Sequence, residues 1–214
     1  MRFLRIFVAV TLIAGLAAPV LASAQEKAKP QEKMTGQEKA MTPEMKQMME
    51  SMQKYGMPGK EHEYLKKYAG DWGIEMKSWM KPEDEPMVST GTMKGEVIFD
   101  GRYLVLHFDS TMMGMPFKGM QLMGYDLFQK KYVTVWVDNM STAFAPTTGT
   151  ADAAGKVFTE TGVWPDPSTG GTSKVKIVTT WLAGGKYTFE MFMPMPDGKE
   201  VKWMEMTATK KGAM

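Results

Sequence analysis

Side chains that commonly carry out catalysis are scarce in this sequence. It has no cysteine and only two histidines, His62 and His107. It contains no Gly-x-Ser-x-Gly nucleophile elbow, no His-Glu-x-x-His zinc pair and no glycine-rich phosphate loop. Carboxylates are plentiful, but a sequence does not show which of them meet across a pocket. The pattern argues against an enzyme and indicates no cofactor, although an enzyme that uses cavity carboxylates is kept as an alternative.

His107 is the histidine with more chemical potential. It lies in Tyr103-x-Val105-x-His107-x-Asp109, where alternate residues share one face of a strand. On an inward face it could bind a metal or haem. The commoner alternative is an exposed or hydrogen-bonded strand histidine. His62 falls near the start of a short helix, where we expect exposure.

Residues 131–138 alternate between two kinds of side chain. One face carries Tyr132, Trp136 and Asp138, and the other carries three valines. A valine face turned inward predicts a simple core, whereas an inward aromatic and polar face is typical of a ligand cavity. The sequence leaves both open. For the second case, the candidate ligand-binding residues are His107, Tyr125, Tyr132, Trp136, Asp138 and Trp203.

Methionine is unusually frequent, with 24 among 214 residues. Clusters fall at 41–57, 112–123 and 191–206. Thioethers could bind Cu(I), a soft ion, or consume oxidants by forming sulfoxides. The commoner explanation is that methionine serves as a flexible core filler. The candidate metal-binding residues are Met112, Met113 and Met115.

From residue 72 onward the apolar pattern has a period of two, which predicts strands. Ten candidates are separated by turn residues, and so many short strands in series indicate an antiparallel up-and-down meander. Closure into a barrel would remove its exposed edges, and a two-sheet sandwich is the alternative. The predicted strands are 72–80, 88–99, 102–112, 117–127, 131–138, 142–151, 156–163, 173–182, 186–193 and 199–209.

A helical extension precedes the strands. Thr42-Pro43-Glu44 is a helix start, and methionines follow at i, i+3, i+4 and i+7. We therefore predict a Met-rich helix over 42–59. A second short helix is expected from about Glu61 to Tyr68. The β-barrel domain would then span 60–211.

The first 24 residues resemble a signal peptide. Arg2 and Arg5 precede an apolar run that ends at Leu21, and Ala22-Ser23-Ala24 follows as a small-x-small cleavage site. The run is shorter than the roughly 20 apolar residues that a membrane-spanning helix needs. We expect cleavage after Ala24 and export to the periplasm or medium. Residues 25–41, which contain three Gln-Glu-Lys triplets, are predicted to be a disordered linker.

Cleavage would remove two arginines and leave 24 basic residues against 24 acidic ones. Such a neutral protein has no overall attraction to nucleic acid or anionic lipid. No other segment is apolar enough to span a membrane. With no cysteine, the fold must be held together by burial alone. The partner that remains is an apolar small molecule, and the sequence leaves the oligomeric state open.

An ordered series of short motifs runs through the predicted barrel. Overall, residues 60–211 resemble the family catalogued as domain of unknown function 1579, whose members are similar to lipocalin-like (calycin) barrels. The motifs that carry the resemblance are Leu65-x-x-Tyr68-Ala69-Gly70-Asp71-Trp72, Asp100-Gly101-Arg102-Tyr103, Pro116-Phe117-x-Gly119, Gly124-Tyr125-Asp126, Lys130-Lys131-Tyr132 and Gly198-Lys199-Glu200.

The resemblance implies an all-β barrel in which Trp72 plugs the closed end against the preceding helix. Arg102 could cover Trp72 through a cation–π contact. Related nitrobindin-type barrels bind haem through a histidine, which is why His107 is a candidate. The family carries no established activity. The most direct expectation is a barrel that binds an apolar or amphipathic small molecule.

Overall fold

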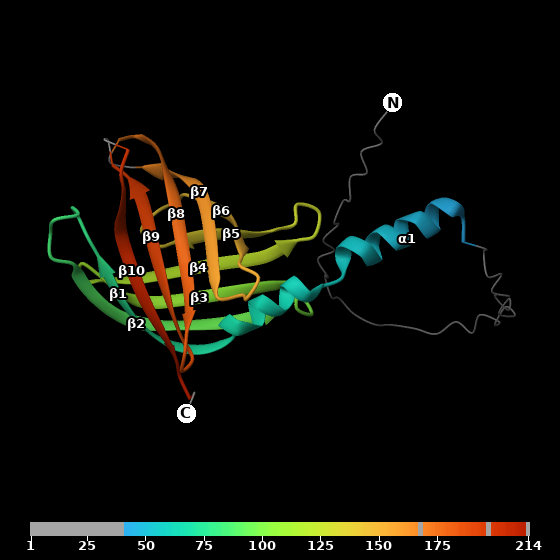
Figure 1. The fold of residues 1–214 in the computed structure, drawn as a ribbon, viewed down its shortest axis with the longest axis horizontal. Helices are drawn as coiled ribbons and strands as arrows, with labels where there is room; N and C mark the ends of the chain where they lie inside the picture. Colours follow the sequence, from blue (N-terminus) through green and yellow to red (C-terminus); the bar gives the residue numbers. More distant parts are fainter. Residues whose placement is uncertain (1–40, 167–168, 196–197, 213–214) are drawn as a thin grey trace, which may run out of the picture. The chain divides into compact units, whose positions relative to one another are not determined.

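The computed structural model describes residues 41–166, 169–195 and 198–212 (Figure 1). The predicted signal peptide and all but the last residue of the predicted linker lie outside the described residues. Within the described residues, two helical segments precede the strands: α1 (Pro43–Gly56) and the 3₁₀ helix η1 (Lys60–Tyr68). Neither is long and apolar enough to cross a membrane, and no other helix of the described residues is.

In the described part of the chain, ten antiparallel strands follow in chain order and close into a barrel (Figure 1). Each strand pairs with its sequence neighbours, and β1 also pairs with β10, for example Ile74 with Ala208. The strands are β1 (Gly70–Ser78), β2 (Met87–Ile98), β3 (Tyr103–Met112), β4 (Met115–Asp126), β5 (Lys131–Asp138), β6 (Ala145–Ala151), β7 (Val157–Asp166), β8 (Gly171–Leu182), β9 (Lys186–Pro194) and β10 (Glu200–Lys210).

This topology confirms the predicted all-β, up-and-down barrel and is not the alternative sandwich. Every strand end lies within three residues of its predicted position. Closure leaves no strand edge unpaired, which protects a meander from edge-to-edge association. The turn between β3 and β4 shows the local cause of such hairpins: Met113 and Gly114 both have positive φ, 51° and 78°. Positive φ at both central residues matches the twist of the flanking strands.

Helix α1 begins where the sequence predicts. The Oγ1 of Thr42 accepts a hydrogen bond from the Met45 amide at 3.2 Å, and proline occupies the first turn. The helix ends at Gly56, three residues before its predicted end. Its methionine stripe is exposed along its whole length. The stripe therefore forms no part of the core of the described residues.

Helix η1 lies at the end of the barrel where β1 begins, in contact with β2, β3 and β4. Trp72 is only 1 % exposed, and its Nε1 donates to the Tyr68 carbonyl at 2.9 Å. This confirms the expected plug. The expected role of Arg102 is wrong, because its Nε donates to the Gly56 carbonyl at 2.9 Å. Lys210 lies over Trp72 instead, with Nζ 5.4 Å from the ring centroid.

His62 corrects a second expectation. It is 5 % exposed, not solvated, because η1 presents this face to the barrel. Its Nδ1 accepts a hydrogen bond from the Gly59 amide at 3.0 Å, and its ring meets the Tyr125 ring edge-on. Burial lowers the pKa of His62. Its role in the structure is to help seat η1 on the barrel.

Candidate functional site

The alternation in β5 places its aromatic and polar residues inside the barrel. Thr134, Trp136 and Asp138 line an internal cavity, while Tyr132 is buried nearer η1. The intervening valines occupy the opposite face. Of the two arrangements left open by the sequence, the structure has the mixed aromatic and polar interior.

The cavity has a volume of about 320 Å³, and Tyr68 of η1 and Tyr187 of β9 are among the residues that line it. Met140 and Ser141, in the loop after β5, line it and are exposed, so this end is its mouth. Its walls are mainly apolar. Among the described residues, seven methionines contribute to the lining: Met76, Met112, Met123, Met140, Met191, Met204 and Met206.

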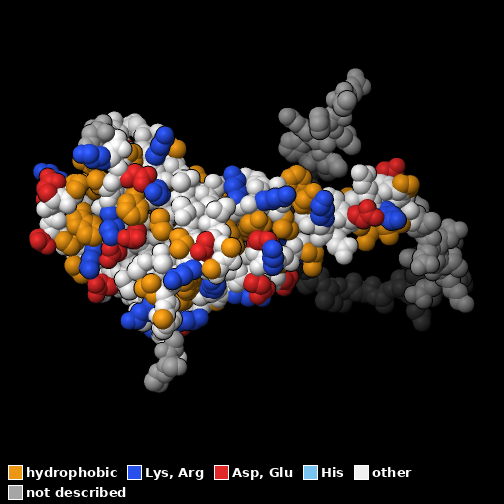
Figure 2. Space-filling model, in the orientation of Figure 1, with side chains coloured by type: hydrophobic (Ala, Val, Ile, Leu, Met, Phe, Trp, Pro, Cys, Tyr) orange, Lys and Arg blue, Asp and Glu red, His pale blue; other side chains and the backbone are white. Residues whose placement is uncertain are grey.

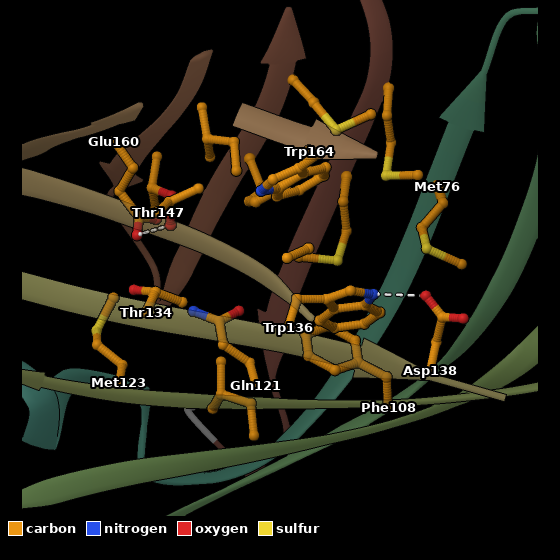
Figure 3. A pocket seen from close by; sticks show the side chains of 18 of the residues that line it. Met76, Phe108, Gln121, Met123, Thr134, Trp136, Asp138, Thr147, Glu160 and Trp164 are labelled. Carbon is orange, nitrogen blue, oxygen red and sulfur yellow. Dashed lines mark hydrogen bonds between the residues drawn. The ribbon is translucent and has the colours of Figure 1, made fainter. Parts of the chain in front are cut away.

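Trp136 forms one aromatic wall (Figure 3). Its ring meets Phe108 edge-on at a centroid distance of 5.1 Å and stacks on Phe117 at 6.2 Å. The indole Nε1 donates to Oδ2 of Asp138 at 2.7 Å, and Oδ1 of that carboxylate accepts from the Met140 amide at 2.9 Å. These contacts fix the indole orientation near the mouth.

Gly119 makes room for that indole. It pairs with Asp138 in the β4–β5 ladder, and a Cβ at this position would overlap the Trp136 ring. The side chain of any other residue would force the indole to move. Gly119 thus determines the shape of the cavity without contributing a side chain to it.

A band of polar side chains crosses the cavity on the side nearer η1. Five consecutive strands, β4 to β8, contribute one inward polar residue each, and Figure 3 shows four of the five residues together, away from Asp138. We call this set the polar band. It consists of Gln121, Thr134, Thr147, Glu160 and Thr179.

Glu160 is the ionisable member of the polar band and is 3 % exposed. Its Oε1 accepts a hydrogen bond from the Thr147 hydroxyl at 2.8 Å. Burial raises the pKa of Glu160, although the Thr134 and Thr147 hydroxyls oppose that rise. The Thr134 hydroxyl lies near enough to Glu160 to oppose the rise in its pKa, yet its Oγ1 makes no hydrogen bond of good geometry with any described group. The cavity therefore holds a desolvated carboxyl group and an unpaired hydroxyl.

The sequence-predicted site residues separate into three groups. Trp136 and Asp138 line the cavity. Tyr125 and Tyr132 lie under η1, where the Tyr132 hydroxyl donates to the Glu61 carbonyl at 2.8 Å. The remaining two candidates, His107 and Trp203, do not line the cavity.

His107 is exposed on the outer face of β3, because Leu106 and Phe108 take the inward positions. Trp203 lies in β10 where the pairing with β9 is irregular, between Lys202 and Met204. The neighbouring residue of β10, Met204, lines the cavity in place of Trp203.

The three candidate methionines do not all line the cavity. Met112 lines the cavity, whereas Met113 and Met115 are exposed at the β3–β4 turn. Among residues 41–166, 169–195 and 198–212, no group of three His, Asp or Glu side chains is arranged to hold a metal ion.

Sequence reasoning missed Glu160 and the threonines around it. One signal was present: Glu160 alternates with Phe158, so both occupy one face of a predicted strand. A carboxylate that shares a face with a core phenylalanine is a candidate buried acid. The threonines carried no such signal, because threonine is common on either face of a strand.

These features define a class of protein: a closed ten-stranded antiparallel barrel with a helical plug at one end and an apolar internal cavity crossed by polar groups. The chain belongs to the family described as "Protein of unknown function (DUF1579)", whose model matches residues 57–210. This confirms the resemblance seen in the sequence motifs. A comparison with curated proteins found no match.

Proposed function

We propose that this protein is exported and binds an apolar or amphipathic small molecule inside the barrel. The observation that carries the proposal is the cavity of about 320 Å³, which has mainly methionine and aromatic walls. Ligand pockets are typically apolar cavities of roughly 300–1,000 Å³ with a few fixed polar groups. The polar band and Asp138 are such groups.

The walls suit a guest held mainly by burial. Each Å² of apolar surface removed from water contributes roughly 25 cal/mol, before the cost of association is subtracted. Methionine side chains adapt to irregular shapes because they are unbranched and polarisable. The seven lining methionines therefore favour a flexible aliphatic guest over one rigid shape.

Binding can be tested by titrating the full mature chain with an environment-sensitive apolar fluorophore. Saturable binding is expected, with affinity at least tenfold weaker in Trp136→Ala because the aromatic wall is lost. Trp203→Ala is the matched control, since Trp203 does not line the cavity. Circular dichroism checks that both variants fold. Equal weakening by the two variants, or no saturable binding by folded protein, would contradict the proposal.

Export is tested separately. The mature chain is expected to begin at Gln25, because Ala22 and Ala24 occupy the small-residue positions that signal peptidase recognises. N-terminal sequencing of the exported protein gives the answer directly. An Ala24→Leu variant should be processed poorly. A protein that retains Met1 after fractionation would overturn the localisation.

A second candidate function is binding of a soft metal ion or consumption of oxidants. It is favoured by one observation, the seven methionines that line one cavity. If the β3–β4 turn is part of such a site, the Cu(I) stoichiometry should fall when Met112, Met113 and Met115 become Leu. Unchanged Cu(I) binding by this variant would exclude these three residues as ligands.

A further inference from the structure

The charged side chains that line the cavity restrict the chemical class of ligand that it can bind. Its lining includes two acidic residues, Asp138 and Glu160, and none of the described lining residues is Lys, Arg or His. On this basis, and resting on the proposed binding function, we infer that the guest is an organic cation: an aliphatic amine whose ammonium group meets Glu160 and whose chain lies along the methionine and aromatic walls.

Glu160 is the natural partner for such a head group. An isolated carboxylate is costly to bury unless it is paired, and the described residues supply Glu160 with a hydroxyl but with no cation in the cavity. An ammonium group brings three donors and one positive charge. It would pair with the carboxylate and offer a donor to the unpaired Thr134 hydroxyl.

Gln121 adds a third acceptor in the polar band. Figure 3 shows the nitrogen of its side-chain amide on the side of Thr134, so a half-turn of the amide would direct its oxygen toward an ammonium group there. In Figure 3 the labelled side chains of Gln121, Thr134 and Glu160 gather on the same side of the cavity. A head group bound there would be screened from water by the walls around it.

The same charges disfavour an anionic guest. A fatty-acid carboxylate would meet Glu160 at the polar band or pass Asp138 near the mouth, with no basic side chain of the described lining to pair with it. Unfavourable pairing of like charges is an effective source of specificity. The cavity should therefore bind an amine more tightly than a carboxylic acid of equal chain length.

The Asp138 carboxylate plays a different part. Both of its oxygens already accept hydrogen bonds, from the Trp136 indole and from the Met140 amide. It lies near the mouth, where the exposed Met140 gives access to solvent. It attracts a cation toward the cavity, whereas Glu160 holds the head group once inside.

The test compares three probes with one chain length and different heads: decylamine, decanol and decanoate. Isothermal titration calorimetry on the mature protein at neutral pH should show that affinity falls from decylamine to decanol to decanoate. Decylamine should bind at least tenfold more tightly than decanol. Glu160→Gln keeps the size and polarity of the side chain and removes its charge. In this variant the preference for decylamine over decanol should fall below about threefold, while decanol still binds.

Other results would contradict the inference, the proposed function or the role of Glu160. Equal binding of decylamine and decanol by the unaltered protein, or tightest binding of decanoate, overturns the inference and leaves the proposed function standing. No binding of any of the three overturns both. If Asp138→Asn removes the preference and Glu160→Gln does not, the assignment of the head group to Glu160 is wrong. Comparison of the three heads on the unaltered protein keeps the inference testable even if a variant does not fold.

Discussion

At the scale of single residues, the burial of the Glu160 carboxyl group disfavours folding. Its carboxyl group lies in an apolar cavity, where desolvation disfavours the charged form. A buried ionisable group of this kind is weak evidence for a stabilising role, because an apolar residue of similar volume is often tolerated better. Its position in a lined cavity supports the proposed recognition of a guest.

The pKa of Glu160 makes stability depend on pH. Burial raises it above its ordinary value of 4.5, so between the unfolded and folded pKa values the folded state holds a proton that the unfolded state has released. The contribution of Glu160 to stability is therefore greatest below about 4.5 and is lost as the pH rises through the folded pKa. We expect Glu160→Gln to flatten this fall, with a higher melting temperature than the unaltered protein at pH 8 and little difference at pH 4.

Thermal unfolding followed by circular dichroism at pH 4, 6 and 8 measures this effect. Glu75→Gln is the matched control, because Glu75 is exposed on the outer face of β1. The control should follow the pH profile of the unaltered protein. If Glu160→Gln follows it as well, Glu160 is not the group responsible.

Gly119 offers a second prediction at this scale. Gly119→Ala places a methyl group where the Trp136 ring lies, so the indole must turn and its bond to Asp138 must lengthen or break. Overpacking of this kind costs about 1–3 kcal/mol. We expect a shifted tryptophan emission maximum and weaker binding of the apolar fluorophore.

The control for this variant is Gly73→Ala. A Cβ at Gly73 meets nothing within 4 Å, so this substitution has room on β1. It should leave both emission and binding unchanged. Normal binding by Gly119→Ala would show that the indole position is not needed for the cavity.

At the scale of elements, η1 stabilises the closed end of the barrel. Leu65 is completely buried and belongs to the same core as Trp72 and Leu104. Removal of a buried leucine side chain typically costs about 2–5 kcal/mol, since a cavity remains. We expect Leu65→Ala to lower the free energy of unfolding by this amount in urea denaturation.

Leu122→Ala is the matched change on the outer face of β4, where Leu122 is 40 % exposed. It should alter the free energy of unfolding by less than about 0.5 kcal/mol. Similar losses in both variants would mean that η1 contributes no more to stability than a surface position does.

The elements themselves could be predicted from the sequence because each leaves a local pattern. The two-residue period and the turn residues predicted all ten strands and their order. Closure into a barrel is less local: the removal of exposed edges favoured it over the sandwich, and the family resemblance strengthened that expectation. Thr42 and Pro43 predicted the start of α1 for the same reason, as a capping arrangement within one turn.

The candidate site was less predictable because it depends on which face of each strand points inward. The valines of β5 would have formed the simpler core, and the sequence left both faces open; Trp136 and Asp138 occupy the interior. The inward face is set by pairing around the whole barrel and not by one strand. For the same reason His107, on β3, could not be placed from its own segment.

At the scale of the whole molecule, surface and interior differ in charge. Figure 2 shows acidic and basic side chains intermingled on the face that it presents. That agrees with the balance of 24 acidic and 24 basic residues expected after signal cleavage. Such a surface has little long-range attraction for a charged guest. Selectivity must therefore arise inside the barrel.

A guest that binds only the folded barrel must also stabilise the whole fold. At a concentration about 100 times its dissociation constant, such a ligand adds about 2.7 kcal/mol of stability. For a domain of this size, about 1 kcal/mol corresponds to roughly 2–4 °C, so decylamine should raise the melting temperature by roughly 5–10 °C. Decanoate at the same concentration should raise it by much less, because it meets two acidic residues and no basic side chain in the described lining.

Propylamine controls for charge without chain and should produce no shift, since it buries too little apolar surface to offset the cost of association. Circular dichroism is a suitable readout because it needs no apolar dye that would compete for the cavity. The shift for decylamine should shrink in Glu160→Gln, whose cavity keeps its apolar walls and loses the acidic partner for the ammonium group. A decylamine shift that is equal in the variant and the unaltered protein would show that the chain alone, and not the charged head, accounts for binding.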